Sequence, residues 1–542
     1  MDLSPHDIIS RLQRLEQDRH NIEQIWALIE RFITPFRIKM FGDEVDWTLR
    51  DLYDATAIKA NYKLAAHLHG ALTNPMIEWF SLELDNPDLR KNSIARQWED
   101  EMNVVNFTSL QNSNFDIEVN EGYLSLTSFG AECMMNAPIE DIDGSLDRID
   151  YKTIPINECF FETDSSGYLI NFYRKMKWTA TEIVEKFGDQ APEEVKKDIE
   201  LNNTSKKYEI IFCIYKQEVD KDYDPFVINA VENRLFQGRY IFTKTKEVLG
   251  EKIGFHEQPV FIALWGKTAG SEWGHSPSMV AIWDVLTLNQ LVKLILTANE
   301  KVVDPTILTT KRGVFGDIDL SSGGVLVVSD IEKSIKAFES SARFDVSALE
   351  KRDLIEAINS TYYVDELQLK ESPAMTATEV NARIQMMQRL IGPTLGRIRR
   401  DLLEPLVTRH FMINYRYKKF PELPDIIKNS GTGLKVRYEG AMAKAQRYEK
   451  AASVERWLSV MGQLTAVYPS MTDIPDTDAI ARYLGEQEGI PENLMHSKEE
   501  VESVRQQRAK EAALRADIER KAMAGQAAQQ MGKGIKELKG EE

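Results

Sequence analysis

Residues 276–301 read SPSMVAIWDVLTLNQLVKLILTANEK, and the organisation of the chain is most readily understood from this segment. Ser276 followed by Pro277 is typical of a helix start, with the serine as the cap and the proline in the first turn. Asp284 and Lys293 are the only charged residues before the final Glu-Lys pair. Apolar side chains cover most of the circumference of the predicted helix, so it must be buried on several sides.

Three environments could bury such a helix. A lipid bilayer is disfavoured because polar residues occupy the middle of the segment, and one centred charge costs about 2.5 to 3.5 kcal/mol on insertion. These residues are Asp284, Thr287, Asn289, Gln290 and Lys293. We therefore do not expect this segment to span a membrane. A central core helix and a helix packed against copies of itself in a ring both remain consistent with the sequence.

Upstream of this segment the chain changes from helical to β character. The spacing of apolar residues predicts helices over about 5–29, 56–72 and 94–109, the first with Ser4 as its cap and Pro5 in its first turn. Four β-branched and aromatic runs predict a small, mostly antiparallel sheet, at 168–178, 208–217, 239–245 and 259–265. The fold class is therefore α+β and mostly α.

Downstream, a short β and turn module is expected at 302–342, where glycines punctuate apolar runs. A helix over about 346–363 follows and leads into a polar loop at 364–374. Thr376-Ala377-Thr378-Glu379 is a capping box, which predicts the start of another helix.

Two prolines, Pro393 and Pro405, should kink that helix or break it into segments. The C-terminal region beyond it is predicted to be all helical. Its Ala-rich stretch at 506–530 has strong helix propensity but little to bury alone. This stretch either packs against neighbouring copies or frays in solution.

Composition excludes several classes of protein. The chain has 542 residues, and 67 Lys plus Arg against 85 Asp plus Glu give a net charge of −18. An acidic surface repels phosphate, which argues against a conventional nucleic-acid binder. The three cysteines, Cys133, Cys159 and Cys213, lack metal-ligand spacing and suit a reducing compartment. With no signal peptide at the N-terminus, we expect synthesis in the cytosol.

Phosphate and calcium loops are incomplete in this sequence. Gly266-Lys267-Thr268 resembles the end of a phosphate-binding loop, but Phe261 stands where the first glycine of that loop belongs. If Gly144 were the invariant glycine of a calcium loop, the first ligand position would be Ile139, which has no ligand oxygen in its side chain. We therefore expect neither nucleotide hydrolysis nor a calcium site.

Histidine patterns also have simpler explanations. His67 and His69 lie two residues apart on a predicted helix, so they point to different faces, unlike a zinc-binding pair. Ser276 after His275 suggests an activated serine, but its place as a helix cap is sufficient to explain it. The sequence predicts no enzyme, no cofactor and no metal, and it favours a structural or assembly protein.

Short motifs follow one another in a definite order over residues 51–411. They are YDATA at 53–57 with Asn61, LA at 64–65, LHG at 68–70, LTNP at 72–75 and WF at 79–80; PINE at 155–158 with FETD at 161–164; WGHSP at 273–277 leading into TLN at 287–289; and MTATEV at 375–380 with Arg383, Leu390 and GP at 392–393. Each motif is weak alone. Their joint order closely resembles the head-to-tail connecting (portal) proteins of short-tailed, podovirus-type phages.

The resemblance implies a portal fold that assembles as a dodecameric ring at one capsid vertex. Double-stranded DNA would be packaged and ejected through this ring, which also joins head to tail. By analogy, the chain would divide into a wing at 1–275, a first stem helix at 276–301, a clip of β and turn structure at 302–345, a second stem helix at 346–363, a tunnel loop and long wing helix at 364–436, and a crown with a candidate C-terminal helical barrel at 437–542.

An acidic channel would let a polyanion slide, whereas many Lys and Arg contacts to phosphates would bind it strongly. Few residues are therefore candidates for contact with DNA. The resemblance suggests Lys370 and Glu371 in the tunnel loop for the channel wall, Lys311 and Arg312 in the clip for contact with partners or DNA, and Leu288, Leu291 and Ile295 for packing of the stem.

The resemblance also implies partners. They are further copies of the chain, the major capsid protein, a terminase ATPase, scaffold proteins and tail adaptor proteins, in a particle assembled in the host cytoplasm. The alternative hypothesis is a scaffold or internal virion protein that oligomerises without an axial channel. A DNA-processing enzyme such as a nuclease has only the abundance of carboxylates in its favour.

Overall fold

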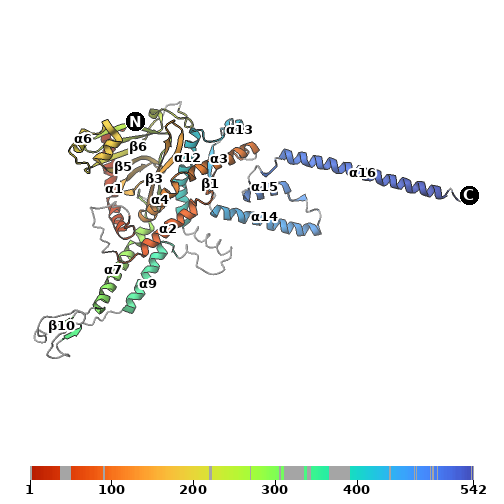
Figure 1. Cartoon of the computed structure of the whole chain (residues 1–542). Helices are drawn as coiled ribbons and strands as arrows, with labels where there is room; N and C mark the ends of the chain where they lie inside the picture. The colour runs from red at the N-terminus through yellow and green to blue at the C-terminus, as the bar shows by residue number, and fades with distance from the viewer. Residues whose placement is uncertain are drawn as a thin grey trace. The chain divides into compact units, whose positions relative to one another are not determined.

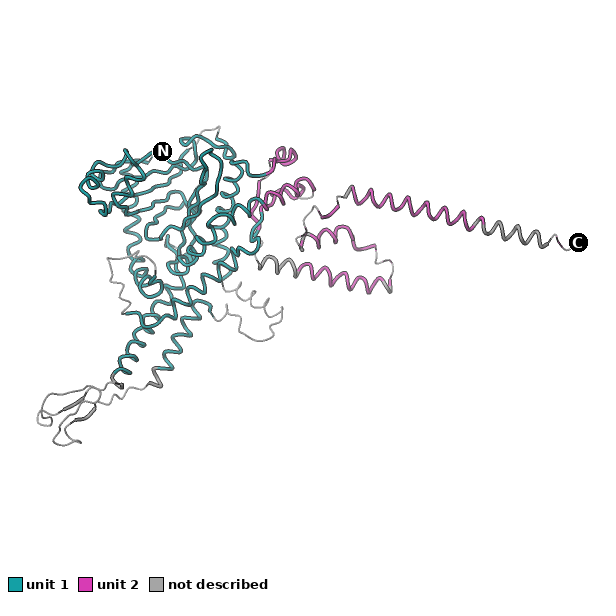
Figure 2. Tube along the Cα trace, viewed as in Figure 1, with its two compact units in different colours: residues 1–81, 105–420, 438–442 teal, residues 82–104, 421–437, 443–542 magenta. Residues whose placement is uncertain are grey.

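The computed structural model describes residues 3–36, 51–89, 92–218, 223–268, 270–303, 307–309, 335–337, 344–364, 391–431, 433–438, 441–468, 470, 473–488, 490, 494–496, 498–538 and 540. The chain forms two compact units (Figure 2). Unit 1 comprises Met1–Ser81, Val105–Phe420 and Tyr438–Met442, and unit 2 comprises Leu82–Val104, Pro421–Arg437 and Ala443–Glu542.

The two largest sheets among the described residues are antiparallel and lie in unit 1 (Figure 1). The larger has the strand order β4-β5-β6-β7-β8, with β4 at Cys159–Thr163, β5 at Leu169–Thr179, β6 at Lys207–Lys216, β7 at Phe236–Phe242 and β8 at Glu247–Phe255. The smaller has the order β3-β2-β9, with β2 at Ala131–Glu140, β3 at Leu146–Thr153 and β9 at Val260–Leu264. Short helices connect these strands, namely η3 at Ile156–Glu158, α5 at Ala180–Phe187, η4 at Gly188–Gln190, α6 at Glu193–Glu200 and η5 at Val231–Asn233.

Helix α1 (Pro5–Phe32) packs one apolar face on the larger sheet. Ile8, Leu12 and Leu15 lie in one buried cluster with residues of that sheet that include Phe160 and Tyr173. This burial removes apolar surface from water on both sides, which stabilises the contact. The predicted cap is confirmed, because the Ser4 side chain accepts a hydrogen bond from the backbone N–H of Asp7 at 3.2 Å.

A buried arginine joins α1 to the start of β4. The Arg19 guanidinium donates to three backbone carbonyls, of Ile156 at 3.1 Å, Asn157 at 2.8 Å and Cys159 at 2.6 Å. It also lies 3.7 Å from the centroid of the Phe160 ring. A planar group with five donors can bind several carbonyls at once, so Arg19 links α1 to the backbone of residues 156–159.

The smaller sheet packs on α4 (Phe115–Phe129), which in turn contacts α2 (Thr56–Leu72). Helices α7 (Pro277–Val303) and α9 (Phe344–Thr361) run side by side and extend away from the sheets (Figure 1). Beyond their far ends, β10 (Ile307–Thr309) pairs antiparallel with β11 (Ile335–Ala337). Most of the module predicted at 302–342 lies outside the described residues.

Residues 391–416 are helical throughout and contain one π-turn, η6 (Arg399–Leu403), directly before α12 (Glu404–Arg416). Of the two predicted outcomes, a kink or a break, a break at Pro393 or Pro405 is therefore wrong for this segment. Pro393 lies in the first described turn, and Pro405 is the second residue of α12, directly after the π-turn, where a residue without an N–H is accommodated. The capping box at 376–379 lies outside the described residues.

Unit 2 contains α13 (Asp425–Lys428), α14 (Ala441–Val467), α15 (Thr477–Glu488) and α16 (Lys498–Leu538). Four described elements cross a boundary between the units in sequence, namely β1 (Phe80–Leu84), α3 (Ser93–Gln111), β12 (Leu434–Tyr438) and α14. Strand β1 pairs with β12. The C-terminal region is helical, as predicted, and Arg505 of α16 binds Asp478 of α15 with two hydrogen bonds of 2.5 and 2.6 Å.

The sequence predicted the bounds of α2 and α3 well, but it did not predict α4. α2 has the predicted bounds, and α3 is a few residues longer than the helix predicted at 94–109. The four predicted strands correspond to β5, β6, β7 and β9. The hairpin of β2 and β3 was missed. Its first strand is buried for four consecutive residues and then carries Asn136 and Pro138, so the alternation that identifies a half-buried strand is lost.

Candidate functional site

The first turn of α7 is held by serine hydroxyls. Ser276 Oγ donates to the Ser128 carbonyl at 2.7 Å and accepts from the backbone N–H of Met279 at 3.0 Å, so the predicted cap is confirmed. Ser278 Oγ lies 2.8 Å from the Thr127 carbonyl and 2.7 Å from the Tyr362 hydroxyl. These bonds fix the start of α7 against the end of α4 and the end of α9.

Two polar residues in the middle of α7, Asn289 and Lys293, contact the segment that precedes α2. Asn289 is buried, its Oδ1 accepts from the backbone N–H of Tyr53 at 2.7 Å, and its Nδ2 donates to the Asp51 carbonyl at 2.7 Å. The Lys293 ammonium lies 5.5 Å from the centroid of the Tyr53 ring, within range of a cation–π interaction. Asn289 therefore holds the segment that leads into α2.

The opposite face of α7 is exposed and uncharged. Six exposed residues recur there every three or four positions, and we call them the α7 stripe: Val280, Trp283, Thr287, Gln290, Leu294 and Thr297. Val280 is 60%, Trp283 61% and Leu294 56% exposed. The two threonine hydroxyls donate to carbonyls of their own helix, at 2.9 and 3.0 Å, so they are already satisfied. A partner would therefore meet a nearly apolar surface.

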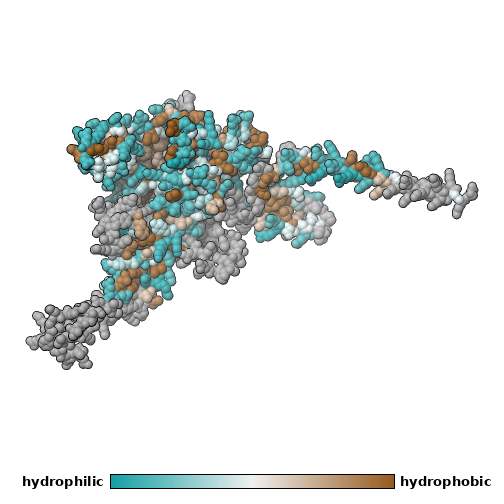
Figure 3. Space-filling view, viewed as in Figure 1, coloured by the Kyte–Doolittle hydropathy of each residue, from teal (hydrophilic) through white to brown (hydrophobic). Residues whose placement is uncertain are grey.

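Helix α7 is apolar on both faces, which is unusual for a helix of a monomeric soluble protein. Ile282, Val285 and Leu288 are buried within the chain, whereas Val280, Trp283 and Leu294 are exposed. Hydrophobic residues are visible on the surface of the paired helices α7 and α9 (Figure 3). Pro277–Glu300 is long and apolar enough to cross a membrane, yet only 33% of its most apolar window is buried within the chain. An exposed apolar surface of this kind marks a contact site.

The three residues predicted to pack the stem all lie on α7. Leu288 is 1% exposed and faces the chain interior, and Leu291 and Ile295 are half-buried. The other predicted site residues, Lys311, Arg312, Lys370 and Glu371, lie outside the described residues. The stem helices predicted at 276–301 and 346–363 correspond in position to α7 and α9.

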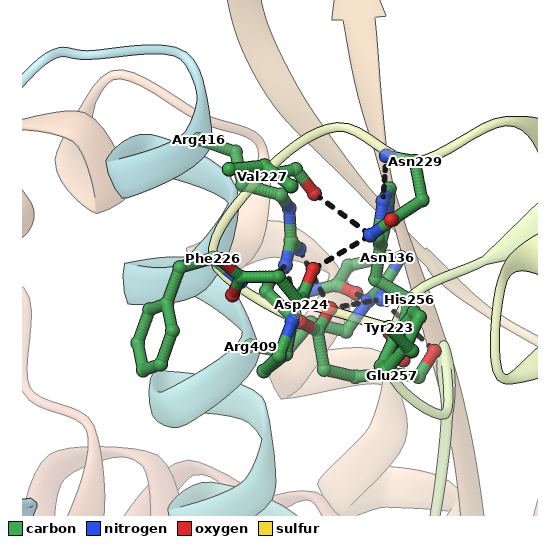
Figure 4. A network of polar contacts seen from close by, with 11 residues as sticks. Asn136, Tyr223, Asp224, Phe226, Val227, Asn229, His256, Glu257, Arg409 and Arg416 are labelled. Carbon is green, nitrogen blue, oxygen red and sulfur yellow. Dashed lines mark hydrogen bonds and ion pairs between the residues drawn. The ribbon is translucent and has the colours of Figure 1, made fainter. Parts of the chain in front are cut away.

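Sequence reasoning missed a buried polar cluster around Glu257 (Figure 4). Arg409 Nη1 donates to Glu257 Oε2 at 2.9 Å, and Arg416 donates to both carboxylate oxygens, at 2.5 and 2.7 Å. Arg409 Nε also donates to Asn136 Oδ1 at 2.7 Å. Burial lowers the pKa of Arg409 to about 10, an effect that Glu257 opposes. No motif could have revealed this cluster, because its members lie far apart in the sequence.

The same cluster anchors the loop 223–229 on α12. The Tyr223 hydroxyl donates to the His256 carbonyl at 3.1 Å, and the backbone N–H of Asn229 donates to His256 Nε2 at 3.0 Å. Burial, followed by the positive charge of Arg416, lowers the pKa of His256 to about 4, so the ring is neutral and can accept that bond. Glu257 is fully engaged by arginines, and we interpret the cluster as a structural clamp.

The three cysteines and Glu132 of unit 1 are buried. Among the described residues, no group of three or more His, Cys, Asp and Glu side chains could hold a metal ion. Cys133, Cys159 and Cys213 are free thiols in the interior. Glu132 is completely buried, and neither carboxyl oxygen has a hydrogen-bond partner among the described residues, so burial raises its pKa well above the usual range.

Comparisons with known proteins agree on one family. The family model described as "Bacteriophage head to tail connecting protein" matches residues 5–495. A portal protein of Salmonella phage epsilon15 is 26% identical over 93% of this chain and 91% of its own length. A probable portal protein of Bordetella phage BPP-1 is 24% identical over 93% of this chain and 90% of its own length.

Among solved structures, a chain from the virion of a native gene transfer agent particle aligns with 85% of this chain and 92% of its own length. The TM-score is 0.36 and the sequence identity 9%, and the assignment does not depend on this likeness. The match of the family model spans all but the last part of the chain and includes both α7 and α9. The chain therefore belongs to the family of bacteriophage head to tail connecting proteins.

Proposed function

We propose that this chain is a portal protein, which forms a ring-shaped channel at one vertex of a phage capsid and joins head to tail. The family supplies the connector role, and both curated relatives carry the name portal protein. In this role the ring is the passage for double-stranded DNA during packaging and ejection. The chain acts as a virion component, with a structural rather than a catalytic task.

The α7 stripe is the observation that supports ring assembly most directly. In a chain that remained monomeric, the apolar side chains of Val280, Trp283 and Leu294 would stay in contact with water, which is unfavourable. A second copy packed on this face would remove the apolar side chains from water. Lipid suits the face less well, because Gln290 interrupts the stripe and the exposed Lys293 lies beside it.

Unit 2 gives a second indication of self-association. On α14 the side chains of Trp457, Val460 and Leu464 are 42%, 53% and 38% exposed and recur at helical spacing. The stretch from Trp457 to Tyr468 contains no charged residue. Apolar surface of this extent on a helix is stabilised by a neighbour. We propose that neighbouring copies also meet in the crown.

The finer assignments follow from the family resemblance. We propose twelve copies in the ring, the tier boundaries predicted from the sequence, and partners that comprise the major capsid protein, scaffold, tail adaptors and a terminase ATPase. That ATPase would supply the packaging force. Lys370 and Glu371 are proposed to face the channel, and Lys311 and Arg312 to contact partners. The net charge of −18 is consistent with a channel that does not hold DNA tightly.

A paired substitution tests the assembly. Trp283→Asp places a charge in the α7 stripe, and Leu201→Asp does the same at an exposed leucine (77%) at the end of α6. We expect both variants to fold, as measured by circular dichroism. Mass photometry should show rings for the wild type and for Leu201→Asp, and mainly unassembled chains for Trp283→Asp.

Electron microscopy of the wild-type assemblies then tests the channel. A hole wide enough for a DNA duplex supports the portal. Compact assemblies without a hole would contradict it and favour the scaffold hypothesis. Intact rings of Trp283→Asp would show that the α7 stripe is not the contact between copies.

A further inference from the structure

A pocket of about 290 Å³ lies where the first turn of α7 meets the last turn of α9. Its walls include Trp265, Pro277, Val280, Ser360, Thr361 and Tyr363. His275 and Ser276 complete the lining. The role of the family in connecting head and tail does not assign a function to this pocket.

The rim of the pocket is rigidly built. Gly266 and His275 exchange two backbone hydrogen bonds, of 3.2 and 2.9 Å, and a Cβ at position 266 would lie 2.2 Å from the imidazole Cε1. Only glycine therefore fits beneath the His275 ring. On the same side, Arg397 Nη1 donates to the Trp265 carbonyl at 2.9 Å. A site held in this way loses little conformational entropy when it is filled.

The far wall carries an unusual backbone. Tyr363 has a φ of 57°, a left-handed conformation that is uncommon for a bulky side chain. Its backbone N–H is bonded to the Ser360 carbonyl at 3.0 Å, which ends α9 and turns the tyrosine into the lining. Strain of this kind persists only where the surrounding structure enforces it, and it concentrates at sites of contact.

The chemistry of the lining selects the occupant. Among the residues that the structure describes, no Lys, Arg, Asp or Glu lines the pocket, so the described walls offer neither a cation for a phosphate nor carboxylates for a metal. The Ser276 hydroxyl is already bonded to Ser128 and Met279. Aromatic and aliphatic walls with a few hydroxyls at the edge suit an apolar side chain.

Continuity with the α7 stripe identifies the source of that side chain. Val280 is both the first residue of the stripe and part of the pocket wall. A partner surface that covers Trp283 and Leu294 would therefore extend to the pocket at the N-terminal end of the α7 stripe. We propose that a second copy of this chain inserts an apolar side chain into the pocket. Each copy would then fill the pocket between α7 and α9 of its neighbour. This inference rests on the proposed ring.

Selective labelling at the pocket tests the proposal in the full-length protein. The three natural cysteines are buried, so a Ser360→Cys variant presents one accessible thiol in the pocket wall. Ser166→Cys places a matched thiol in the exposed turn before β5. In the Ser360→Cys variant, the thiol should react with a maleimide at least about tenfold more slowly in rings than in unassembled chains. The reason is that a covered thiol reacts only when the contact opens. Position 166 should react equally in both states.

The identity of the occupant is read by cross-linking. A benzophenone maleimide on the Ser360→Cys variant, in rings mixed from ¹⁴N- and ¹⁵N-labelled chains, should give cross-links that join light and heavy peptides. Rings in which position 360 reacts at the unassembled rate, or gives only cross-links within one chain, would overturn the pocket inference alone. A chain that forms no rings would overturn the proposed function as well.

Discussion

Helices α4 and α7 are both rich in apolar residues, but only α4 is buried by its own chain. Ten of the fifteen residues of α4 are buried, among α2, β2, β3 and α7. In α7 only 33% of the most apolar window is buried, and Trp283 is 61% exposed. The comparison shows that composition reveals that a helix needs a partner, whereas the structure reveals whether that partner belongs to the same chain.

The two faces of α7 sharpen this contrast. Leu288 and Asn289 face the chain, whereas Trp283 and Gln290 face away from it. If the outer face is covered only in the assembly, substitutions on the two faces should affect different measurements. Inner substitutions should change the free energy of unfolding of the single chain, and outer substitutions should change association.

The largest effect is expected for Leu288→Asp. Leu288 is 1% exposed, and an unpaired charge there should lower the free energy of unfolding by about 4 kcal/mol or more. Trp283→Asp is the matched control on the outer face, where the change should stay within about 0.5 kcal/mol. Urea denaturation of dilute chain measures both values. A normally folded, ring-forming Leu288→Asp variant would contradict the assignment of the inner face.

A second effect is expected at α4, where Glu132 lies against Gly122. A Cβ at position 122 would lie 2.1 Å from Glu132 Oε1, so the missing side chain makes room for the carboxyl group. Burial raises the folded pKa of Glu132, so the ionised carboxylate is less favourable in the folded chain than in the unfolded chain. Replacing it with methionine should therefore stabilise unit 1 at pH 7, by about 1–3 kcal/mol.

The free energy of unfolding should depend on pH because of Glu132, and the direction of this dependence can be predicted. Below an unfolded pKa of about 4.3 the carboxyl group is neutral in both states, so ionisation adds no penalty. As the pH rises above that value, the wild type should lose stability relative to Glu132→Gln by up to about 1.4 kcal/mol per pH unit. Denaturation at pH 4.5 and pH 7 measures the difference. A constant difference across this range would show that the carboxyl group ionises normally in the folded chain.

The smallest effect is expected for Asn289→Ala. This change removes the bonds to the Asp51 carbonyl and the Tyr53 N–H and should lower the free energy of unfolding by about 1–2 kcal/mol. Gln290→Ala, one residue along but on the outer face, should leave it unchanged. Equal losses for both variants would mean that α7 has no distinct inner face.

Local signals explain which parts of the fold were predictable. Ser4 and Ser276 cap their helices because a serine before an apolar periodic segment supplies a missing acceptor within a few residues. The clamp of Glu257 with Arg409 and Arg416 could not be predicted, since its members are brought together only by tertiary packing. The π-turn before Pro405 was missed because a proline in a helix is as consistent with a local rearrangement as with a break.

The candidate site was predictable in part. The apolar segment 276–301 indicated a helix that needs partners, and the ordered motifs indicated the family. Neither signal identified which face of α7 is exposed, because polar residues such as Asn289 are expected outside until their backbone partners are known. The pocket beside Val280 has no sequence signature, since its walls come from three separate segments.

Cryo-electron microscopy of the assembled full-length protein tests the central claim most directly. The account predicts closed rings around an axial channel, with the α7 stripe from Val280 to Thr297 covered by a neighbouring copy. Rings that leave this stripe in solvent, or compact assemblies without a channel, would contradict it.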